Sequence, residues 1–136
     1  NPIRMNDSGF ILINKPEGIT SSDLVLKIKR LKKLKKIGHT GTLDKFACGL
    51  MILPYGNFTA FSSHFLGQDK LYEAFFCFGK STDSGDRDGE ILESWEEPQI
   101  SEFFQKNRDL IEEKIHSIQS WKTQNAPLVS ALKVKG

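Results

Sequence analysis

The 136-residue sequence is typical of an α+β protein, because apolar runs of strand length alternate with segments of helical spacing. Two apolar runs, residues 9–13 and 50–54, have the length of buried strands, and a third run covers residues 71–78. Between the first two, apolar residues from position 24 to position 31 recur at the spacing of one helix face. We therefore predict strands packed against helices in one domain, which a chain of this length can support.

The composition is that of a soluble globular protein, with 38% hydrophobic and 26% charged residues. No apolar run approaches the roughly 20 residues that span a bilayer, and no signal peptide precedes the first predicted strand. Cys48 and Cys77 form neither a C-x-x-C pair nor a disulfide framework, so we expect a reducing, cytoplasmic setting. The net charge of +2 does not by itself indicate a nucleic-acid partner.

The first predicted strand leads through a turn at residues 14–18 into a basic helix. Thr20, Ser21 and Ser22 are all suitable helix N-caps. From position 27 to position 36 the sequence has seven bases and no acid. We expect four of these bases to lie opposite the apolar stripe Leu24, Ile28 and Leu31, namely Lys29, Arg30, Lys33 and Lys36. They form either a solvated helix face or a surface that binds phosphates, which would relieve their mutual repulsion.

The next segment, residues 38–44 (GHTGTLD), combines a flexible backbone with polar side chains. Its two glycines permit close backbone approach and unusual dihedral angles. His39 and Asp44 bring polar chemistry to the same turn. From these residues alone, the segment is either a structural turn or a loop that brings an acid to a ligand.

The second predicted strand is followed by aromatic residues and a third strand. Phe58, Phe61 and Phe65 have the spacing of a short amphipathic helix, and we expect them to pack in the core rather than stack on bases. Residues 71–78 are apolar on both faces, which predicts a central strand of the sheet, with Tyr72 at its entrance.

An acidic loop, residues 81–90, interrupts the apolar pattern. Aligning Gly89 with the glycine of a calcium-binding EF-hand loop places Trp95 at the twelfth position, where a bidentate glutamate is required, so calcium is excluded. We predict a mobile loop, a returning strand at residues 91–95 and a helix capped by Ser101. The tail from Trp121 to Val134 is expected to be strand and loop.

Several common catalytic motifs are absent from the sequence. It lacks the P-loop, the dinucleotide-binding G-x-G-x-x-G, the zinc motif H-E-x-x-H and the nucleophile elbow G-x-S-x-G. The three histidines are too scattered to predict a zinc site. What remains is an aspartate in a glycine-rich loop, an aromatic residue and a run of bases, a set suited to chemistry on a nucleotide without a metal.

These residues occur in a series of motifs that closely resembles the TruB-type pseudouridine synthases. Residues 38–44, with 47–50 and 53–54 after them, resemble the signature of that family. Four further segments resemble its K-P-x-G-x-T-S, D-K-x-Y, T-D-x-x-D-x-D-G and P-x-x-S-A-x-K-x-x-G motifs, in family order: residues 15–21, 69–72, 82–89 and 127–136. The resemblance implies an α+β fold with a mixed, largely antiparallel sheet flanked by helices.

The resemblance also implies roles for individual residues. Asp44 falls on the catalytic aspartate, which attacks or deprotonates the target nucleoside while the uracil is detached, turned and rejoined through carbon. Tyr72 falls on the tyrosine that packs against the flipped base, and His39 on the histidine that helps to hold the flipped-out RNA. Lys15 and Lys133 fall on lysines near the site, where they either contact RNA, support the loop of Asp44 or lie in solvent. The implied substrate is the T-loop uridine of transfer RNA, with no cofactor or metal, and we expect a monomer.

The sequence departs from the family pattern at a few positions. Lys45 stands in place of a proline, Cys48 in place of a small residue, and Ala126 and Val129 in place of a proline and an aromatic residue. We expect residues 1–136 to be the N-terminal part of a catalytic domain, because the family continues into a later segment whose arginine pairs with the aspartate, often followed by an RNA-binding domain. Whether these residues act alone therefore stays open. The alternatives are an RNA-binding fragment without catalysis and a subunit of a guide-RNA-directed synthase.

Overall fold

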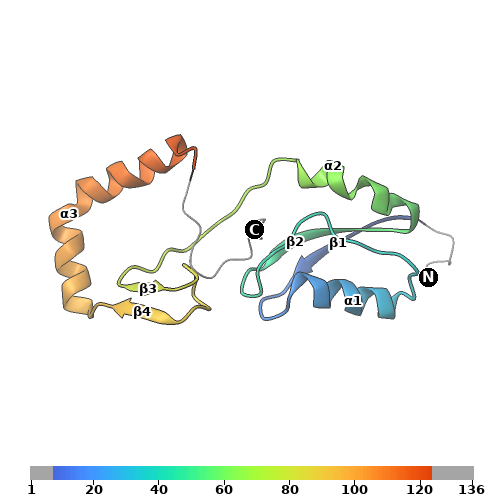
Figure 1. Cartoon of the computed structure of the whole chain (residues 1–136), viewed down its shortest axis with the longest axis horizontal. Coiled ribbons are helices and arrows are strands. Elements are labelled where there is room, and N and C mark those ends of the chain that lie inside the picture. Colours follow the sequence, from blue (N-terminus) through green and yellow to red (C-terminus); the bar gives the residue numbers. More distant parts are fainter. Residues whose placement is uncertain (1–7, 124–136) are drawn as a thin grey trace, which may run out of the picture. The chain divides into compact units, whose positions relative to one another are not determined.

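The computed structural model describes residues 8–123. The chain divides into two compact units, residues 1–72 and residues 73–136, whose elements are labelled in Figure 1. In the described part, three α-helices accompany two antiparallel pairs of strands. The predicted α+β class is therefore confirmed, with two small antiparallel sheets as its β component.

The first unit is built on the antiparallel strands β1 (Gly9–Lys15) and β2 (Gly49–Tyr55). Ile11 lies opposite Leu53 and Ile13 lies opposite Met51, so both strands turn apolar side chains to one face. The strands predicted at residues 9–13 and 50–54 are confirmed, and each is slightly longer than predicted.

Helix α1 (Ser21–Leu31) covers that apolar face (Figure 1). It begins at Thr20, whose hydroxyl accepts a hydrogen bond from the Asp23 N–H at 3.1 Å, so one of the three predicted caps is used. Leu24 packs against Met51 and Leu53 in the buried core. Ile28 packs on the edge of this core, whereas Leu31 is 66% exposed and lies outside it, contrary to the prediction.

The other face of the sheet contacts an aromatic cluster. A 3-10 helix, η1 (Gly56–Phe61), continues into α2 (Ser62–Leu66), in agreement with the predicted short helix. Phe10 of β1 meets Phe58 and Phe65 edge to face, with ring centroids 5.1 and 5.2 Å apart. The phenylalanines therefore pack with one another, although Phe58 and Phe61 remain partly open to solvent.

The second unit contains a hairpin and a long helix. Strands β3 (Lys80–Thr82) and β4 (Ile91–Ser94) pair antiparallel and are followed by α3 (Glu97–Ser117) and a 3-10 turn, η2 (Ile118–Ser120). Phe78, just before β3, meets Phe104 of α3 edge to face, with ring centroids 4.8 Å apart, so the N-terminal half of the helix contacts the segment that enters the hairpin. The returning strand predicted at residues 91–95 is confirmed. All fully buried residues of the described part lie in the first unit, so this second unit has no closed core there.

Two predictions about these elements are wrong. Residues 71–78 form no strand; Leu71 is 100% exposed and Phe75 is 88% exposed. Ser101 does not cap a helix, because α3 begins four residues earlier, where the Gln99 side chain accepts a hydrogen bond from the Glu96 N–H at 2.9 Å. The predicted tail lies outside the described residues from position 124 onward.

None of the helices in the described part has both the length and the apolar character that crossing a membrane requires.

Candidate active site

The Asp44 side chain is exposed on the loop between α1 and β2. Within residues 8–123 its carboxylate takes part in no hydrogen bond or ion pair, whereas its backbone carbonyl accepts from the Ala47 N–H at 3.1 Å. The main chain of Asp44 is thus held while its acid group is open to solvent. A carboxylate in that position is ionised at neutral pH and can act as a nucleophile or a base.

Both neighbours of Asp44 are hydrogen-bonded to the connection between β1 and α1. On one side, the Ser21 hydroxyl accepts from the Leu43 N–H at 2.9 Å and donates to the Leu43 carbonyl at 2.8 Å. On the other side, the Lys45 carbonyl accepts from the Gly18 N–H at 2.8 Å. Gly18 has a φ of 88°, in the left-handed region that favours glycine, so this turn depends on its residue type.

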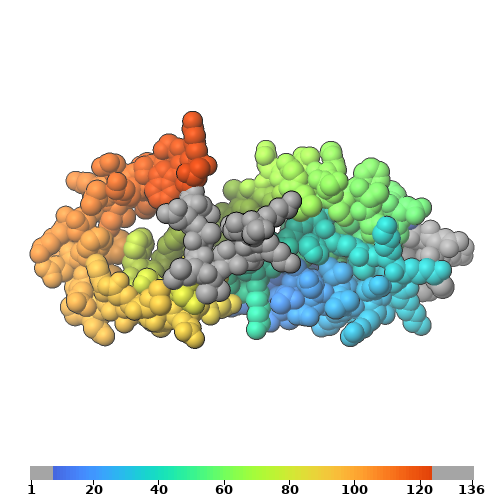
Figure 2. All heavy atoms as spheres, viewed as in Figure 1, coloured from blue at the N-terminus to red at the C-terminus, as the bar shows by residue number. Residues whose placement is uncertain are grey.

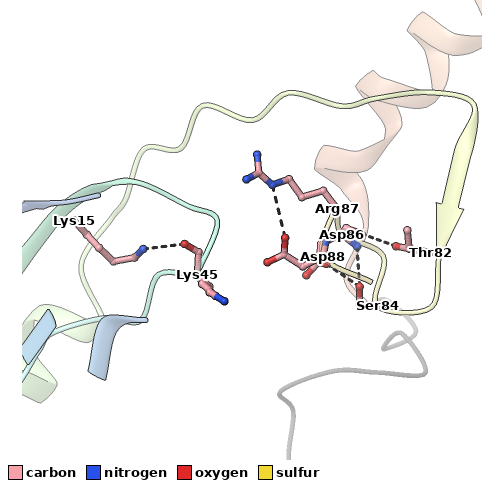
Figure 3. A network of polar contacts seen from close by, with 7 residues as sticks. All are labelled: Lys15, Lys45, Thr82, Ser84, Asp86, Arg87 and Asp88. Carbon is pink, nitrogen blue, oxygen red and sulfur yellow. Dashed lines mark hydrogen bonds and ion pairs between the residues drawn. The ribbon is translucent and has the colours of Figure 1, made fainter. Parts of the chain in front are cut away.

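Lys15 adds a third link to the same connection. Its side chain is completely buried, and its ammonium donates to the carbonyls of Pro16, Ile19 and Lys45 at 3.0, 2.8 and 3.4 Å. Figure 3 shows the Lys15 ammonium directed at the Lys45 carbonyl. All three donor positions of this ammonium point at protein oxygens. Of the roles left open for Lys15, the geometry therefore favours support of the Asp44 loop over contact with RNA.

The start of the loop is held along the free edge of β2. Gly38 donates from its N–H to the Pro54 carbonyl at 2.9 Å, and Thr40 donates to the Ile52 carbonyl at 3.1 Å. His39 lies between these two anchors, and its Nδ1 atom is buried without a hydrogen-bond partner among the described residues. The segment that resembles the family signature is therefore fixed at both ends, and Asp44 lies in its exposed part.

Tyr72 follows the segment that passes close to this loop. A Cβ atom placed on Gly41 would come within 3.9 Å of the Lys70 Cε atom. The Tyr72 side chain itself is 66% exposed and lies outside any strand, so the predicted place at a strand entrance is wrong. In the described part, no hydrogen bond or ring contact joins Tyr72 to Asp44 or His39.

The basic run does not continue as a helix beyond Leu31, contrary to the prediction. The helix ends where the Leu34 N–H donates to the Lys29 carbonyl at 3.0 Å and the Lys33 N–H donates to the Arg30 carbonyl at 3.2 Å. This is the Schellman arrangement, in which the residue after the cap takes a left-handed conformation and is usually glycine. Here it is Lys33, with a φ of 52°. Lys33 and Lys36 therefore lie in the turn after α1.

The run is nevertheless open to solvent. Lys29 is partly exposed, and the other six bases between positions 27 and 36 are exposed. In Figure 2, α1 and its following turn form part of the visible surface in blue to cyan. None of the ion pairs between described residues involves this run. Its like charges are thus available to an anionic ligand.

The acidic loop of the second unit is organised by its own side chains. Asp86 accepts from the Ser84 hydroxyl at 2.8 Å and from the Asp88 N–H at 3.0 Å, and these bonds, the Ser84 bond foremost, hold the pKa of Asp86 below its ordinary value. Asp83 accepts from the Glu90 N–H across the loop at 2.8 Å. Figure 3 shows the bonds around Asp86. Within residues 8–123, no three His, Cys, Asp or Glu side chains are grouped as a metal site requires.

Lys133 and Ser21 are the remaining positions of the predicted and observed site. Lys133 lies outside the described residues. The sequence indicated Ser21 as a possible helix cap and as the last residue of the motif at residues 15–21, but not its two bonds to Leu43. No local signal could reveal them, because the two residues are 22 positions apart.

Fold and site together define an α+β protein that presents a free carboxylate from a loop anchored on both sides, in a chain that also exposes a run of bases. Residues 29–136 match the family described as "TruB family pseudouridylate synthase (N terminal domain)". The chain belongs to this family.

Individual relatives agree with the family match. The chain is 52% identical over its whole length to a protein from Leptospira interrogans and 39% identical over 97% of its length to one from Mesoplasma florum. It is 38% identical over 94% of its length to a protein from Aquifex aeolicus. All three are named tRNA pseudouridine synthase B, and the matches span 44%, 44% and 42% of those proteins. The chain thus corresponds to less than half of the length of these relatives.

Proposed function

We propose that this chain supplies the aspartate-bearing part of a transfer-RNA pseudouridine synthase, which isomerises the T-loop uridine. The observation that carries the proposal is the free carboxylate of Asp44 on a loop whose neighbouring residues are all anchored. Membership of the TruB family and relatives named tRNA pseudouridine synthase B support the reaction class. No cofactor or metal enters the proposal.

The reaction moves the sugar bond of uracil from nitrogen to carbon. The bond between N1 and C1′ breaks, the uracil turns, and a bond forms between C5 and C1′. The proton of C5 goes to solvent, and N1 takes up a proton in its place, so the product is an isomer of the substrate. The Asp44 carboxylate either attacks the nucleoside or removes a proton from it. Either role needs an ionised oxygen that reaches a base turned out of its stack.

Two further residues are assigned to the flipped nucleotide. The largely exposed ring of Tyr72 is free to stack on the uracil, and stacking on an aromatic ring stabilises an unpaired base. The unpartnered Nδ1 atom of His39 is suited to a hydrogen bond that helps to hold the flipped-out conformation. Lys133 is assigned a supporting or RNA-contacting role by resemblance alone.

The basic run is assigned to the phosphate backbone of the transfer RNA. Its seven bases without an acid create a local positive potential in a chain whose net charge is only +2. Lys29, Arg30, Lys33 and Lys36 would contribute affinity that falls with salt and carries no sequence preference. Such an enzyme would act as a monomer in the cytoplasm.

A tritium-release assay tests the reaction. The matched segment of the Leptospira relative is replaced by residues 1–136, and the chimera is incubated with transfer RNA labelled with tritium at C5 of uridine. We expect tritium release, and we expect Asp44→Asn to lower turnover at least ~1000-fold with RNA affinity retained. Asp109→Asn, at an exposed position of α3, is the matched control and should leave turnover within about twofold.

Residual activity within tenfold of the parent in Asp44→Asn would assign the chemistry to another residue. If the chimera with Asp44 in place binds RNA but releases no tritium, the alternative of an RNA-binding fragment without catalysis would be favoured instead. Tritium release that appears only with a guide RNA and accessory proteins would point to the guided enzyme.

Salt dependence tests the assignment of the basic run. Replacing Lys29, Arg30, Lys33 and Lys36 with glutamine should flatten the plot of log affinity against log salt by up to ~0.7–0.9 for each lost phosphate contact. The matched control replaces four bases of the second unit with glutamine and changes the net charge equally: Lys106, Arg108, Lys114 and Lys122. Equal slopes for the two quadruple variants would mean that the run affects RNA binding only through the net charge of the chain and makes no specific phosphate contacts.

A further inference from the structure

Each of the two peptide groups that flank Asp44 is held by a hydrogen bond of its own. The peptide before it carries the Leu43 carbonyl, which accepts from the Ser21 hydroxyl at 2.8 Å. The peptide after it carries the Asp44 carbonyl, which accepts from the Ala47 N–H at 3.1 Å. These two planes set φ and ψ of Asp44, so they determine the direction in which its side chain leaves the backbone.

The bonds to Leu43, on the N-terminal side of Asp44, come from a side chain, that of Ser21, whereas the Asp44 carbonyl is bonded by a backbone N–H. Ser21 is almost completely buried, at 3% exposure, and its hydroxyl both donates to the Leu43 carbonyl and accepts from the Leu43 N–H. It therefore fixes the N–H and the carbonyl of one residue at the same time. Water cannot readily replace a hydroxyl at a buried position.

The location of Ser21 makes it a rigid support. It is the first residue of α1, whose next turn packs Leu24 into the core against Met51 and Leu53. The hydroxyl thus connects the helix that is anchored in the core to the loop of Asp44. Sites held by elements packed in the core keep their geometry better than sites on unsupported loops.

We infer that Ser21 is a positioning residue, which orients the peptide between Leu43 and Asp44 and thereby aims the Asp44 carboxylate. This role goes beyond the use of Ser21 as a helix residue, because the helix cap is supplied by Thr20. The inference rests on the proposed function where it concerns catalysis. Its geometric part concerns the chain itself and holds independently of the reaction.

Amide hydrogen exchange tests the geometric part on the 136-residue chain. Ser21→Ala should lower the protection of the Leu43 amide about tenfold or more, because its acceptor is lost. Ser22→Ala removes a hydroxyl at the neighbouring exposed position and should leave that protection unchanged. Equal protection of Leu43 in Ser21→Ala and in the parent chain would overturn the inference.

Turnover of the chimera tests the catalytic part. Ser21→Ala should lower kcat about 10- to 100-fold while KM for transfer RNA stays within about twofold, since a small misplacement of a reacting group is costly and the RNA contacts are intact. Ser21→Thr retains the hydroxyl and should restore most of kcat, and Ser22→Ala should match the parent. A kcat of Ser21→Ala within twofold of the parent would overturn the positioning role. So would a fall in kcat that is explained by a lower melting temperature of the variant and is accompanied by a change in KM. If the parent chimera forms no pseudouridine, the proposed function fails, and the exchange of Leu43 still decides whether Ser21 holds this peptide.

Discussion

The buried ammonium of Lys15 lies 3.4 Å from the carbonyl oxygen of Lys45, the residue that follows Asp44. The two residues are 30 positions apart, and the contact ties the last residue of β1 to the loop that carries the acid. A buried ammonium surrounded by carbonyls has no counter-charge among its hydrogen-bond partners. Lysine is rarely buried in this way, because removing a charge from water is costly.

Replacement of Lys15 should nevertheless destabilise the first unit, because the carbonyls that its ammonium bonds would lose their donor. Lys15→Met keeps the length of the side chain but leaves the Pro16 and Ile19 carbonyls without this donor, so we expect a loss of about 1–3 kcal/mol in the free energy of unfolding. Lys45→Met is the control, because the exposed Lys45 takes part through its carbonyl, which the substitution retains, and its effect should stay within about 0.5 kcal/mol. Denaturant unfolding measures both. Equal effects of the two substitutions would mean that the Lys15 ammonium does not hold the turn.

The left-handed conformation of Lys33 leads to a second prediction. Lys33→Gly should raise the free energy of unfolding by up to about 1 kcal/mol, because glycine adopts this conformation without a Cβ clash. Lys32→Gly removes the same charge one residue earlier, where φ is −93°, and should lower stability by about 0.5–1 kcal/mol. Denaturant titration of both variants should give shifts of opposite sign, and a loss of stability in both would contradict the strain at Lys33.

Tyr72 should contribute to RNA binding and little to folding. Tyr72→Ala should weaken transfer-RNA binding by roughly 1–3 kcal/mol, whereas Tyr72→Phe keeps the ring and most of the affinity. Because the side chain is largely exposed, the melting temperature of the alanine variant should stay that of the parent. Trp121→Ala, at a similarly exposed aromatic residue, is the control for affinity. An alanine variant that melts earlier but binds RNA normally would make Tyr72 a structural residue.

The acidic loop should show a pH response centred on Asp86. The Ser84 hydroxyl stabilises the ionised form of Asp86 and holds its pKa below the ordinary value of an aspartate, so Ser84→Ala should raise the pKa of Asp86 towards that ordinary value. A carboxylate with a lowered pKa stabilises the folded hairpin above the unfolded pKa, and this contribution is lost as the pH falls through the folded pKa. Carbon-13 chemical shifts of the carboxyl groups, followed against pH, measure the change. Ser81→Ala, on β3, should leave the titration of Asp86 unaltered.

The elements that the sequence predicts well are those specified by local patterns. Strands β1, β2 and β4 follow apolar runs, and Thr20 is a polar cap directly before a helical repeat. The end of α1 was not predictable in the same way, because Lys33 occupies a position where glycine is the usual signal. The start of α3 was missed because the capping pair of Glu96 and Gln99 precedes the serine that seemed the better cap.

The strand predicted at residues 71–78 was wrong for a different reason. An apolar run describes what the side chains prefer, but a strand also needs a partner that supplies hydrogen bonds. No neighbouring strand pairs with these residues in the described part, and their side chains are exposed. The sequence could identify Asp44 by its motif and left support of the Asp44 loop open as one role of Lys15. It could not reveal that Lys15 is buried or that Ser21 bonds to Leu43, because these bonds join distant positions and a lysine is normally expected in solvent.

The exposed apolar side chains of residues 71–78 affect how the protein behaves at high concentration. Leu71, Phe75 and Phe76 are each more than four-fifths exposed, and the backbone beside them has no strand partner in the described part. An apolar stretch of this kind, in which Glu73 is the one charged residue, is a template on which a second chain can pair, which leads to aggregation. Purified material should therefore be sensitive to concentration, and charged substitutions at these positions are the direct way to keep it dispersed.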